Sequence, residues 1–214
     1  MYTLLIETST NRGSAAIGRD GQVIRSIELS GSRDVAKNAH DLCQKAGIRF
    51  QELGLCIVGI GPGSYTGIRV AVSFAKGIAV ALKIPLIPMS SLYGLVPEAD
   101  GTFMAAIDAK VGGVFVAQGR KKGLDVSWEK GPERIDDGAF SQRADLVDYV
   151  VTIERSWITH KQLEFATPVI TSCPQADVLI RQGWQQFQEG TSVLPKDLHP
   201  LYLRRTQAEI EKDS

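Results

Sequence analysis

The stretch GIGPGSYTGIRVAVSFAKGIAVALKIP, residues 59–85, joins a glycine-rich turn to a long helical pattern. Apolar or small residues fill nearly every position from 68 to 82, and Pro85 is expected to end the helix. One narrow polar stripe at helical spacing interrupts the pattern, formed by Arg69, Ser73 and Lys76. A surface helix needs an apolar arc of only about 100°. We therefore expect this helix to be covered on two sides, by its own sheet on one side and by either a second intramolecular layer or a partner on the other. The small residues Gly67, Ala71 and Ala75 favour a partner, because they allow a helix to approach closely.

The turn before the helix resembles a phosphate-binding loop but departs from both common patterns. A nucleoside-triphosphatase loop needs Lys and then Ser or Thr after its second glycine, whereas Gly67 is followed by Ile68. A dinucleotide-binding loop needs a third glycine or alanine where Ser64 stands. Two interpretations stay open: an anion binds the free amides at the helix N-terminus, or Ser64 caps the helix.

Strands and helices alternate along the chain, which indicates an α/β protein. The first hundred residues predict three strands, a helix, a strand and the long helix. The segment FMAAIDAKVGGVFVAQG, residues 103–119, then repeats the order of LLIETSTNRGSAAIG, residues 4–18: strand, carboxylate, glycine-containing turn, strand. This repeat predicts two lobes, residues 1–100 and 101–204, with the tail 205–214 returning to the first lobe.

Composition narrows the classes of function. The 214 residues include 24 Lys or Arg and 24 Asp or Glu, so the chain lacks the basic excess of proteins that bind nucleic acid alone. Three cysteines without metal-ligand or redox spacing predict free thiols in a reducing compartment. The N-terminus lacks the features of a signal peptide, and no apolar run reaches the roughly 20 residues of a membrane span. We expect a cytoplasmic protein that does not contact membranes.

The sequence offers few groups for catalysis. A hydrolase with Ser64 as nucleophile would need glycine at position 62, which is Pro62. The three histidines are isolated, so none forms a local metal-binding pair: His40, His160 and His199. Glu7 and Asp108, at the two lobe turns, are candidates for a carboxylate pair of the kind that handles magnesium and phosphate in sugar kinases.

Several segments resemble the TsaB family of bacterial tRNA threonylcarbamoyladenosine biosynthesis proteins. They are GIGPGSYTGIRVAVSFAKGIA (59–79), IPLIPMSSL (84–92), LLIETSTNRGSAAI (4–17), AIDAKVGGVFVA (106–117) and LHPLYLRR (198–205). These segments occur in the family's order over nearly the whole chain. The resemblance implies two duplicated actin/hexokinase-like (ASKHA) lobes of ribonuclease-H type. It also implies a non-catalytic subunit that pairs with the catalytic paralog TsaD and acts with the ATPase TsaE. Together they transfer threonylcarbamoyl to the adenosine beside the anticodon of tRNAs that read codons beginning with A.

The same resemblance implies that catalytic groups are missing from this chain. The paralog binds its metal through two histidines, and the matching positions here are Ser91 and Leu95, so we expect no metal. The family usually has Asp at the position of Glu7 and often has Glu at the position of Gly113. We therefore expect no tightly bound cofactor, and weak ATP or ADP binding only in the complex. The residues of a vestigial nucleotide cleft would be Glu7, Thr8, Ser9, Asp108 and Lys110.

The long helix is the predicted interface. The residues expected to bind the partner are Tyr65, Arg69, Val70, Ser73, Phe74 and Ile78. Without the paralog, the same face is expected to form a homodimer, and tRNA is expected to bind through the complex. The alternative is an independent nucleotide-dependent ASKHA enzyme, or a glycoprotease-like peptidase, with a complete active-site cleft.

Overall fold

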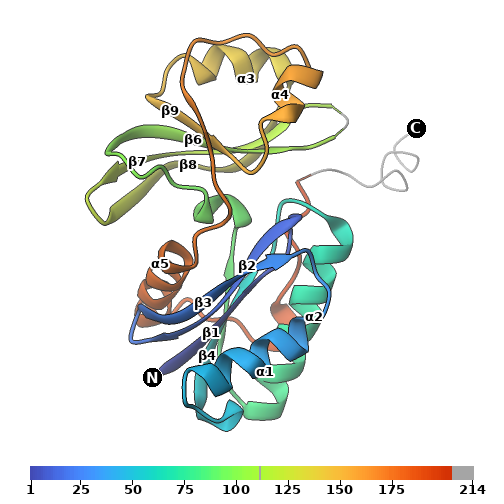
Figure 1. Cartoon of the computed structure of the whole chain (residues 1–214), viewed down its shortest axis with the longest axis vertical. Helices are drawn as coiled ribbons and strands as arrows, with labels where there is room; N and C mark the ends of the chain where they lie inside the picture. The colour runs from blue at the N-terminus through green and yellow to red at the C-terminus, as the bar shows by residue number, and fades with distance from the viewer. Residues whose placement is uncertain (111, 204–214) are drawn as a thin grey trace.

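The computed structural model describes residues 1–110 and 112–203, which form two lobes stacked along the long axis of the molecule (Figure 1). The first lobe is built on a five-stranded mixed sheet with the strand order β3-β2-β1-β4-β5. Its strands are β1 (Tyr2–Glu7), β2 (Arg12–Arg19), β3 (Gln22–Ser30), β4 (Leu53–Gly59) and β5 (Leu86–Met89). The two-residue turn between β2 and β3 has positive φ at both Asp20 and Gly21, as a hairpin turn that matches the strand twist requires.

Helices cover both faces of the first sheet. α1 (Val35–Lys45) and α2 (Tyr65–Leu82) pack on one face, and α5 (Ala176–Gln188) packs on the other. Alternate residues of β1 supply the two cores, because successive side chains of a strand point to opposite faces. Leu4 and Ile6 lie in the core under α1 and α2, whereas Leu5 lies in the core under α5.

The second lobe repeats the architecture of the first. Its strand order is β10-β9-β6-β7-β8. Read from the other edge, β8-β7-β6-β9-β10, it places equivalent strands in the same positions as the first sheet. Its elements are β6 (Gly101–Asp108), β7 (Val114–Lys122), β8 (Asp125–Ile135), α3 (Asp137–Ala144), β9 (Tyr149–Thr152), α4 (Ser156–His160) and β10 (Val169–Thr171). α3 and α4 occupy the places that α1 and α2 occupy in the first lobe. The α/β fold of two duplicated ASKHA lobes, ribonuclease-H-like, is confirmed.

The predicted boundary of the second lobe at residue 204 needs correction. α5 contacts strands β1 to β5 of the first sheet, so the chain has already returned to the first lobe at residue 176. Val193 then bridges Leu86 at the edge of that sheet, and Leu198 is buried in the first lobe's core. The physical reason is that the face of the first sheet opposite α2 needs an apolar cover, which α5 supplies. The tail 205–214 lies outside the described residues.

Short 3-10 helices complete the connections: η1 (Phe50–Glu52), η2 (Ser91–Gly94) and η3 (Pro195–Asp197). η2 begins the link between the lobes. Leu92 and Leu95 are buried with Phe103 of the second lobe, and Tyr93 stacks on Trp128 of β8 at 4.5 Å between ring centroids. The second sheet therefore packs against the link and α5 on one face, and against α3 and α4 on the other.

α2 also has the length and composition of a membrane-crossing helix, with a mean hydropathy of 1.3 over Tyr65–Leu82. The expectation that no apolar run approaches about 20 residues concerned uninterrupted runs, and Arg69 and Lys76 interrupt this one. Core helices of folded domains meet the same criterion, and α2 packs along β4. That packing accounts for part of its apolar character. The helix ends at Leu82, where Lys83 adopts a left-handed conformation, three residues before Pro85.

The three cysteines are free thiols, as the sequence predicted. Cys43 and Cys56 are buried, and burial raises the pKa of the Cys56 thiol to about 12. Both side chains act as small apolar residues of the first core.

Candidate functional site

The turn after β1 holds a fully buried carboxylate. Glu7 has no solvent-exposed surface, and its two oxygens accept hydrogen bonds from different segments of the first lobe. The Ser9 amide donates to Oε1 at 2.5 Å, and the Ser91 hydroxyl donates to Oε2 at 2.6 Å. The Ser9 hydroxyl in turn donates to the Ser91 hydroxyl at 2.6 Å. We call these three residues the Glu7 network.

Glycines close the space around the Glu7 network. A Cβ at Gly59 would lie 1.7 Å from Oε2 of Glu7, and a Cβ at Gly67 would lie 1.9 Å from the Thr8 carbonyl oxygen. Only glycine permits these approaches. The Thr8 hydroxyl donates to the Gly67 carbonyl at 2.8 Å, which fastens the turn to the first turn of α2. The turn residues Thr8 and Ser9 are consequently buried, and the position expected to face a nucleotide is enclosed by protein.

The glycine-rich turn before α2 is occupied by the protein's own groups. The Ser64 hydroxyl accepts a hydrogen bond from the Gly67 amide at 3.2 Å, so Ser64 is the N-cap of the helix. The Ser64 amide donates to the Ser9 carbonyl at 2.5 Å. Of the two interpretations of this turn, the geometry favours the cap.

Burial dominates the electrostatics of Glu7. It raises the pKa of the carboxyl above its ordinary value, and the hydrogen bonds from Ser9 and Ser91 only partly oppose this effect. A buried carboxyl held by two donors, with no solvent contact, has the character of a structural group. It lacks the access to substrate that a catalytic acid or base requires.

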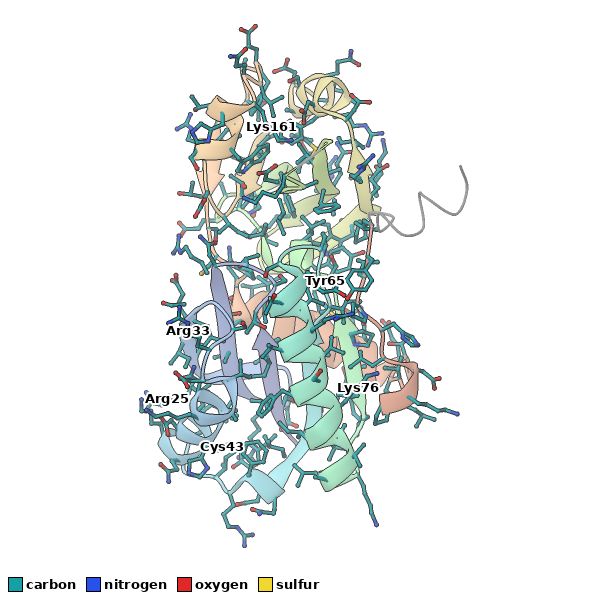
Figure 2. All side chains as sticks on the ribbon, turned by 90° about the vertical axis from the view of Figure 1, so that its right-hand side faces the viewer. Arg25, Arg33, Cys43, Tyr65, Lys76 and Lys161 are labelled. Carbon is teal, nitrogen blue, oxygen red and sulfur yellow. The ribbon has the colours of Figure 1, made fainter. Side chains whose placement is uncertain are left out.

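The equivalent turn of the second lobe, after β6, neutralises its carboxylate with lysines. The side chain of Asp108 is 13% exposed, and its oxygens lie 3.4 Å from the Lys161 ammonium and 3.5 Å from that of Lys110. Lys161, labelled in Figure 2, also donates to the Gly113 carbonyl at 2.9 Å and to Asp137 at 3.0 Å. Lys110 is exposed at the tip of the turn, with a left-handed backbone.

Gly113 explains why this turn has no glutamate. Its φ is +116°, and a Cβ there would lie 2.0 Å from the Ile135 carbonyl oxygen. A side chain at this position would force the turn away from β8. Within residues 1–110 and 112–203, no three His, Cys, Asp or Glu side chains come together as metal ligands would. The predicted cleft residues therefore lie in two separate, internally satisfied turns.

The residues predicted to bind a partner do not share one exposed face of α2. Tyr65, Arg69 and Ser73 are exposed, and Tyr65 lies at the end of the helix nearest the second lobe (Figure 2). The Arg69 guanidinium lies 4.0 Å from the centre of the Tyr65 ring, and its Nε donates to the Tyr202 hydroxyl at 3.4 Å. These residues form an ordered aromatic and cationic cluster on the surface.

The other three predicted interface residues turn toward the first lobe's own core. Val70 and Phe74 are half-buried against it, and Ile78 is only 7% exposed. Ile78 packs mainly within its own lobe, so it would offer a partner little area, and its place in a partner interface stays a prediction. The helical repeat places Val70, Phe74 and Ile78 on the shoulder of α2 that faces α1 and Phe50.

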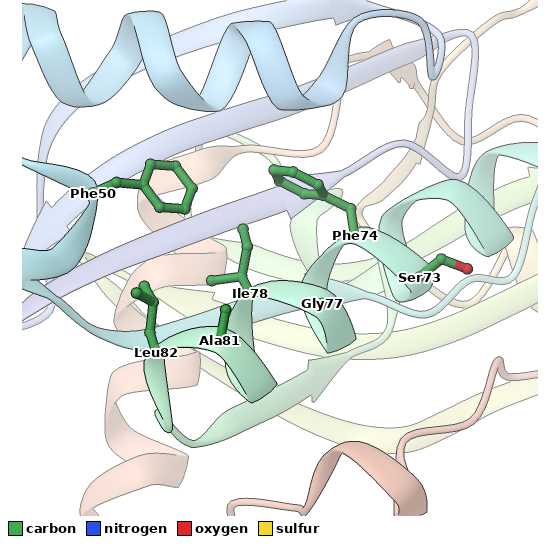
Figure 3. Close-up of a pocket in the computed structure, with 7 residues that line it drawn as sticks. All are labelled: Phe50, Ser73, Phe74, Gly77, Ile78, Ala81 and Leu82. Carbon is green, nitrogen blue, oxygen red and sulfur yellow. The ribbon is translucent and has the colours of Figure 1, made fainter.

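An open hollow lies along this shoulder (Figure 3). It has a volume of about 370 Å³ and is lined by Phe50, Ser73, Phe74, Gly77, Ile78, Ala81 and Leu82. The Gly77 position faces open space, since a Cβ there would meet no atom within 4 Å. Val80, on the neighbouring solvent side, is 65% exposed. Small and apolar groups therefore remain uncovered beside the polar stripe.

Comparisons with known proteins bear on both the fold and the cleft. Residues 31–151, more than half of the chain, match the family model described as TsaD, tRNA N6-adenosine threonylcarbamoyltransferase. The chain belongs to this family, as a TsaB-type member. The tRNA threonylcarbamoyladenosine biosynthesis protein TsaB of Escherichia coli strain K12 is 26% identical, covering 97% of this chain and 96% of its own length.

Two further relatives separate the TsaB-type proteins from the transferases. The tRNA N6-adenosine threonylcarbamoyltransferase of Granulibacter bethesdensis is 30% identical over 51% of this chain, but over only 33% of its own length. The solved structure of YeaZ from Pseudomonas aeruginosa superposes with a TM-score of 0.82, at 21% identity, covering 94% of this chain and 99% of that one. The chain thus shares its whole fold with YeaZ and part of its sequence with the transferases.

Sequence reasoning missed two of the groups that define the site. It treated Ser91 only as a poor metal ligand, whereas Ser91 is the hydroxyl partner of Glu7, 84 residues away along the chain. It did not single out Lys161, which carries the counter-charge for Asp108. No spacing in the sequence predicts the Glu7–Ser91 pair or the Asp108–Lys161 pair, because each joins segments that only the folded chain brings together.

Proposed function

We propose that this chain is a non-catalytic subunit of the machinery that adds threonylcarbamoyl to the adenosine next to the anticodon of tRNA. In this proposal it activates the catalytic paralog TsaD by forming a heterodimer with it, and acts together with the ATPase TsaE. The TsaB-type relatives are named for biosynthesis of this modified nucleoside, and the family model is named for the transferase. We propose that it works in the cytoplasm and contacts tRNA through the complex.

The observation that carries the non-catalytic role is the Glu7 network. Where an enzyme of this fold would hold a free carboxylate toward a nucleotide, Glu7 is buried and bonded to Ser9 and Ser91. Ser91 and Leu95 stand at the positions of the paralog's two histidines, and Leu95 is fully buried in the interlobe cluster. We therefore propose that no metal and no nucleotide binds tightly to the isolated chain. An independent kinase-like or peptidase activity finds no support in these contacts.

The surface that supports a partnership is α2. The helix leaves Arg69, Ser73 and Val80 exposed beside the hollow that Phe74 and Gly77 line. Helix surfaces that pair with another helix typically carry such a mixture of small, apolar and polar groups. The match of part of this chain to the transferase family model includes α2, which supports an equivalent helix in the paralog. We propose that the two helices pair by pseudo-symmetry.

Reconstitution of the tRNA modification tests this proposal. Purified paralog, ATPase, tRNA, ATP and an activated threonylcarbamoyl donor are incubated with and without this chain, and the modified nucleoside is measured by mass spectrometry. We expect product only when the chain is present, and no product from the chain without the paralog. Product formed equally without the chain, or formed by the chain alone, would refute the proposed role.

The variant Val80→Asp separates partner binding from folding. Val80 is 65% exposed, so a carboxylate there leaves the core of the chain intact. We expect the variant to keep the wild-type melting temperature while losing both the complex and the product. The matched control is Leu146→Asp, at a side chain of the second lobe that is 78% exposed, which should keep both. A Val80→Asp chain that remains fully active would assign the interface to another surface.

A further inference from the structure

The solvent-facing side of α2 is basic. With about 3.6 residues per turn, five side chains point away from the first lobe in one direction. They are Arg69, Ser73, Lys76, Val80 and Lys83, of which Lys83 is the residue that ends the helix. α2 contains no Asp or Glu, so this face presents three positive charges and no negative charge of its own.

The three cations of this face form no ion pair in the described part of the chain. Among its ion pairs, none involves Arg69, Lys76 or Lys83. Two neighbouring elements pack against α2: α1 carries two lysines and one aspartate, and η3 carries one lysine and one aspartate, so together they leave this side positively charged. The chain as a whole is neutral, with 24 basic and 24 acidic residues, so the basic side of α2 is a local feature.

Apolar groups interleave with these charges. Val80 lies between Lys76 and Lys83 and is 65% exposed, and the hollow lined by Phe74 and Gly77 runs alongside. Nucleic acid would leave these apolar groups uncovered, because phosphates are bound by charge and hydrogen bonds. A protein helix with an apolar strip and flanking carboxylates would cover the apolar groups and pair with the cations.

We infer that this face selects a partner that presents acidic side chains, in preference to a second copy of this chain. The inference rests on the proposed function, in which α2 is the pairing surface. In a two-fold homodimer each cation meets the same set of cations. If the axis passes through the middle of α2, Lys76 is the cation nearest to it. An acidic partner converts that repulsion into attraction.

The charge pattern gives the two pairings opposite responses to salt. Salt screens repulsion and attraction alike, so raising it from about 50 mM to about 500 mM should strengthen self-association and weaken binding to the paralogous transferase subunit. Sedimentation velocity measures the first equilibrium, and titration calorimetry with the purified paralog measures the second. Partner binding that is unchanged or strengthened by salt would overturn the inference.

Reversal of one charge sharpens the test. Lys76→Glu should lower affinity for the paralog about tenfold, and should pair with the wild-type chain more tightly than the wild type pairs with itself. Lys130→Glu makes the same change of net charge on β8 of the second lobe, where Lys130 is exposed, and should alter neither equilibrium. If the two variants change the affinities equally, only the net charge of the chain matters and not the position of Lys76. That result would overturn the inference.

The outcomes distinguish this inference from the proposed function. If wild-type chain and paralog do not associate at any salt concentration, the proposed function itself fails. If they associate but neither salt nor Lys76→Glu weakens the complex, the proposed function stands and acidic selection is wrong. Fluorescence anisotropy with labelled tRNA tests whether the isolated chain binds RNA directly. Binding of tRNA by the isolated chain that Lys76→Glu abolishes would make this face an RNA site and would overturn the inference.

Discussion

The turns after β1 and β6 occupy equivalent places in the two lobes, yet they satisfy their carboxylates by different means. Glu7 is buried and held by an amide and a hydroxyl, without a cation. Asp108 stays close to the surface and is neutralised by Lys161 and Lys110. The two lobes therefore share the backbone plan of strand, acidic residue and turn, while the groups that satisfy the carboxylate differ between them.

The helices that follow the fourth strand of each lobe, α2 and α4, differ as much as the turns. α2 has 18 residues and a surplus of exposed surface, whereas its counterpart α4 has 5 and is anchored by the buried Trp157 and Ile158. A helix of five residues completes a core but offers little area to a partner. Within the proposed function, the comparison favours the first lobe as the one that binds a partner, and a structural role for both turns.

The largest loss of stability is expected from removing the Glu7 side chain in the turn after β1. Glu7→Ala leaves Ser9 and Ser91 without their acceptor and creates a cavity, so it should lower the free energy of unfolding by about 3 kcal/mol. Glu7→Gln preserves the shape, since its amide donates to the Ser91 hydroxyl and its carbonyl accepts from the Ser9 amide. Denaturant unfolding should leave Glu7→Gln close to wild type. Equal losses for the two variants would mean that Glu7 acts through its charge.

The second turn should respond less. Lys161→Met removes the cation that Asp108, Asp137 and the Gly113 carbonyl share, and should cost about 1–2 kcal/mol because these groups keep partial access to water. Adding Asp108→Asn should recover part of the loss, since one unpaired charge is then gone. Lys130→Met is the exposed control. A loss for Lys161→Met no greater than that of the control would remove the contrast between the turns.

A smaller effect is expected from pH. The pKa of Glu7 is raised by burial, so its folded-state value exceeds its unfolded value. Its contribution to stability is then fully present below the ordinary value of 4.5 and is lost as pH rises through the folded-state pKa. The stability of wild type relative to Glu7→Gln should therefore fall as pH rises from acid to neutral. A difference that grows with pH would indicate a lowered pKa and contradict this account of the first turn.

The smallest expected effect is that of a chelator. Ser91 is engaged with Glu7 and Leu95 is buried, so elemental analysis of the purified chain should find no stoichiometric iron or zinc. Thermal melting should be unchanged by EDTA. Near one metal per chain after a chelator wash would contradict the assignment of these positions as structural.

The sequence predicted the features that depend on local pattern. The repeat of strand, carboxylate and turn at residues 4–18 and 103–119 predicted the duplicated lobes, and the apolar pattern of 68–82 predicted α2. It could not predict that α5 crosses back to the first sheet, because two apolar sheet faces compete for the same cover. Ile78 was assigned to a partner for a similar reason. Helical periodicity identifies an apolar face without identifying what covers it.

The central claim is that the chain acts through α2 and not through the cleft, and one experiment compares the two directly. The double variant Glu7→Gln, Asp108→Asn and the single variant Val80→Asp are assayed in the reconstituted tRNA modification, each after its melting temperature and its binding to the paralog are measured. The account predicts wild-type product formation for the cleft variant, and loss of both binding and product for Val80→Asp. A cleft variant that binds the paralog normally but yields no product would contradict it.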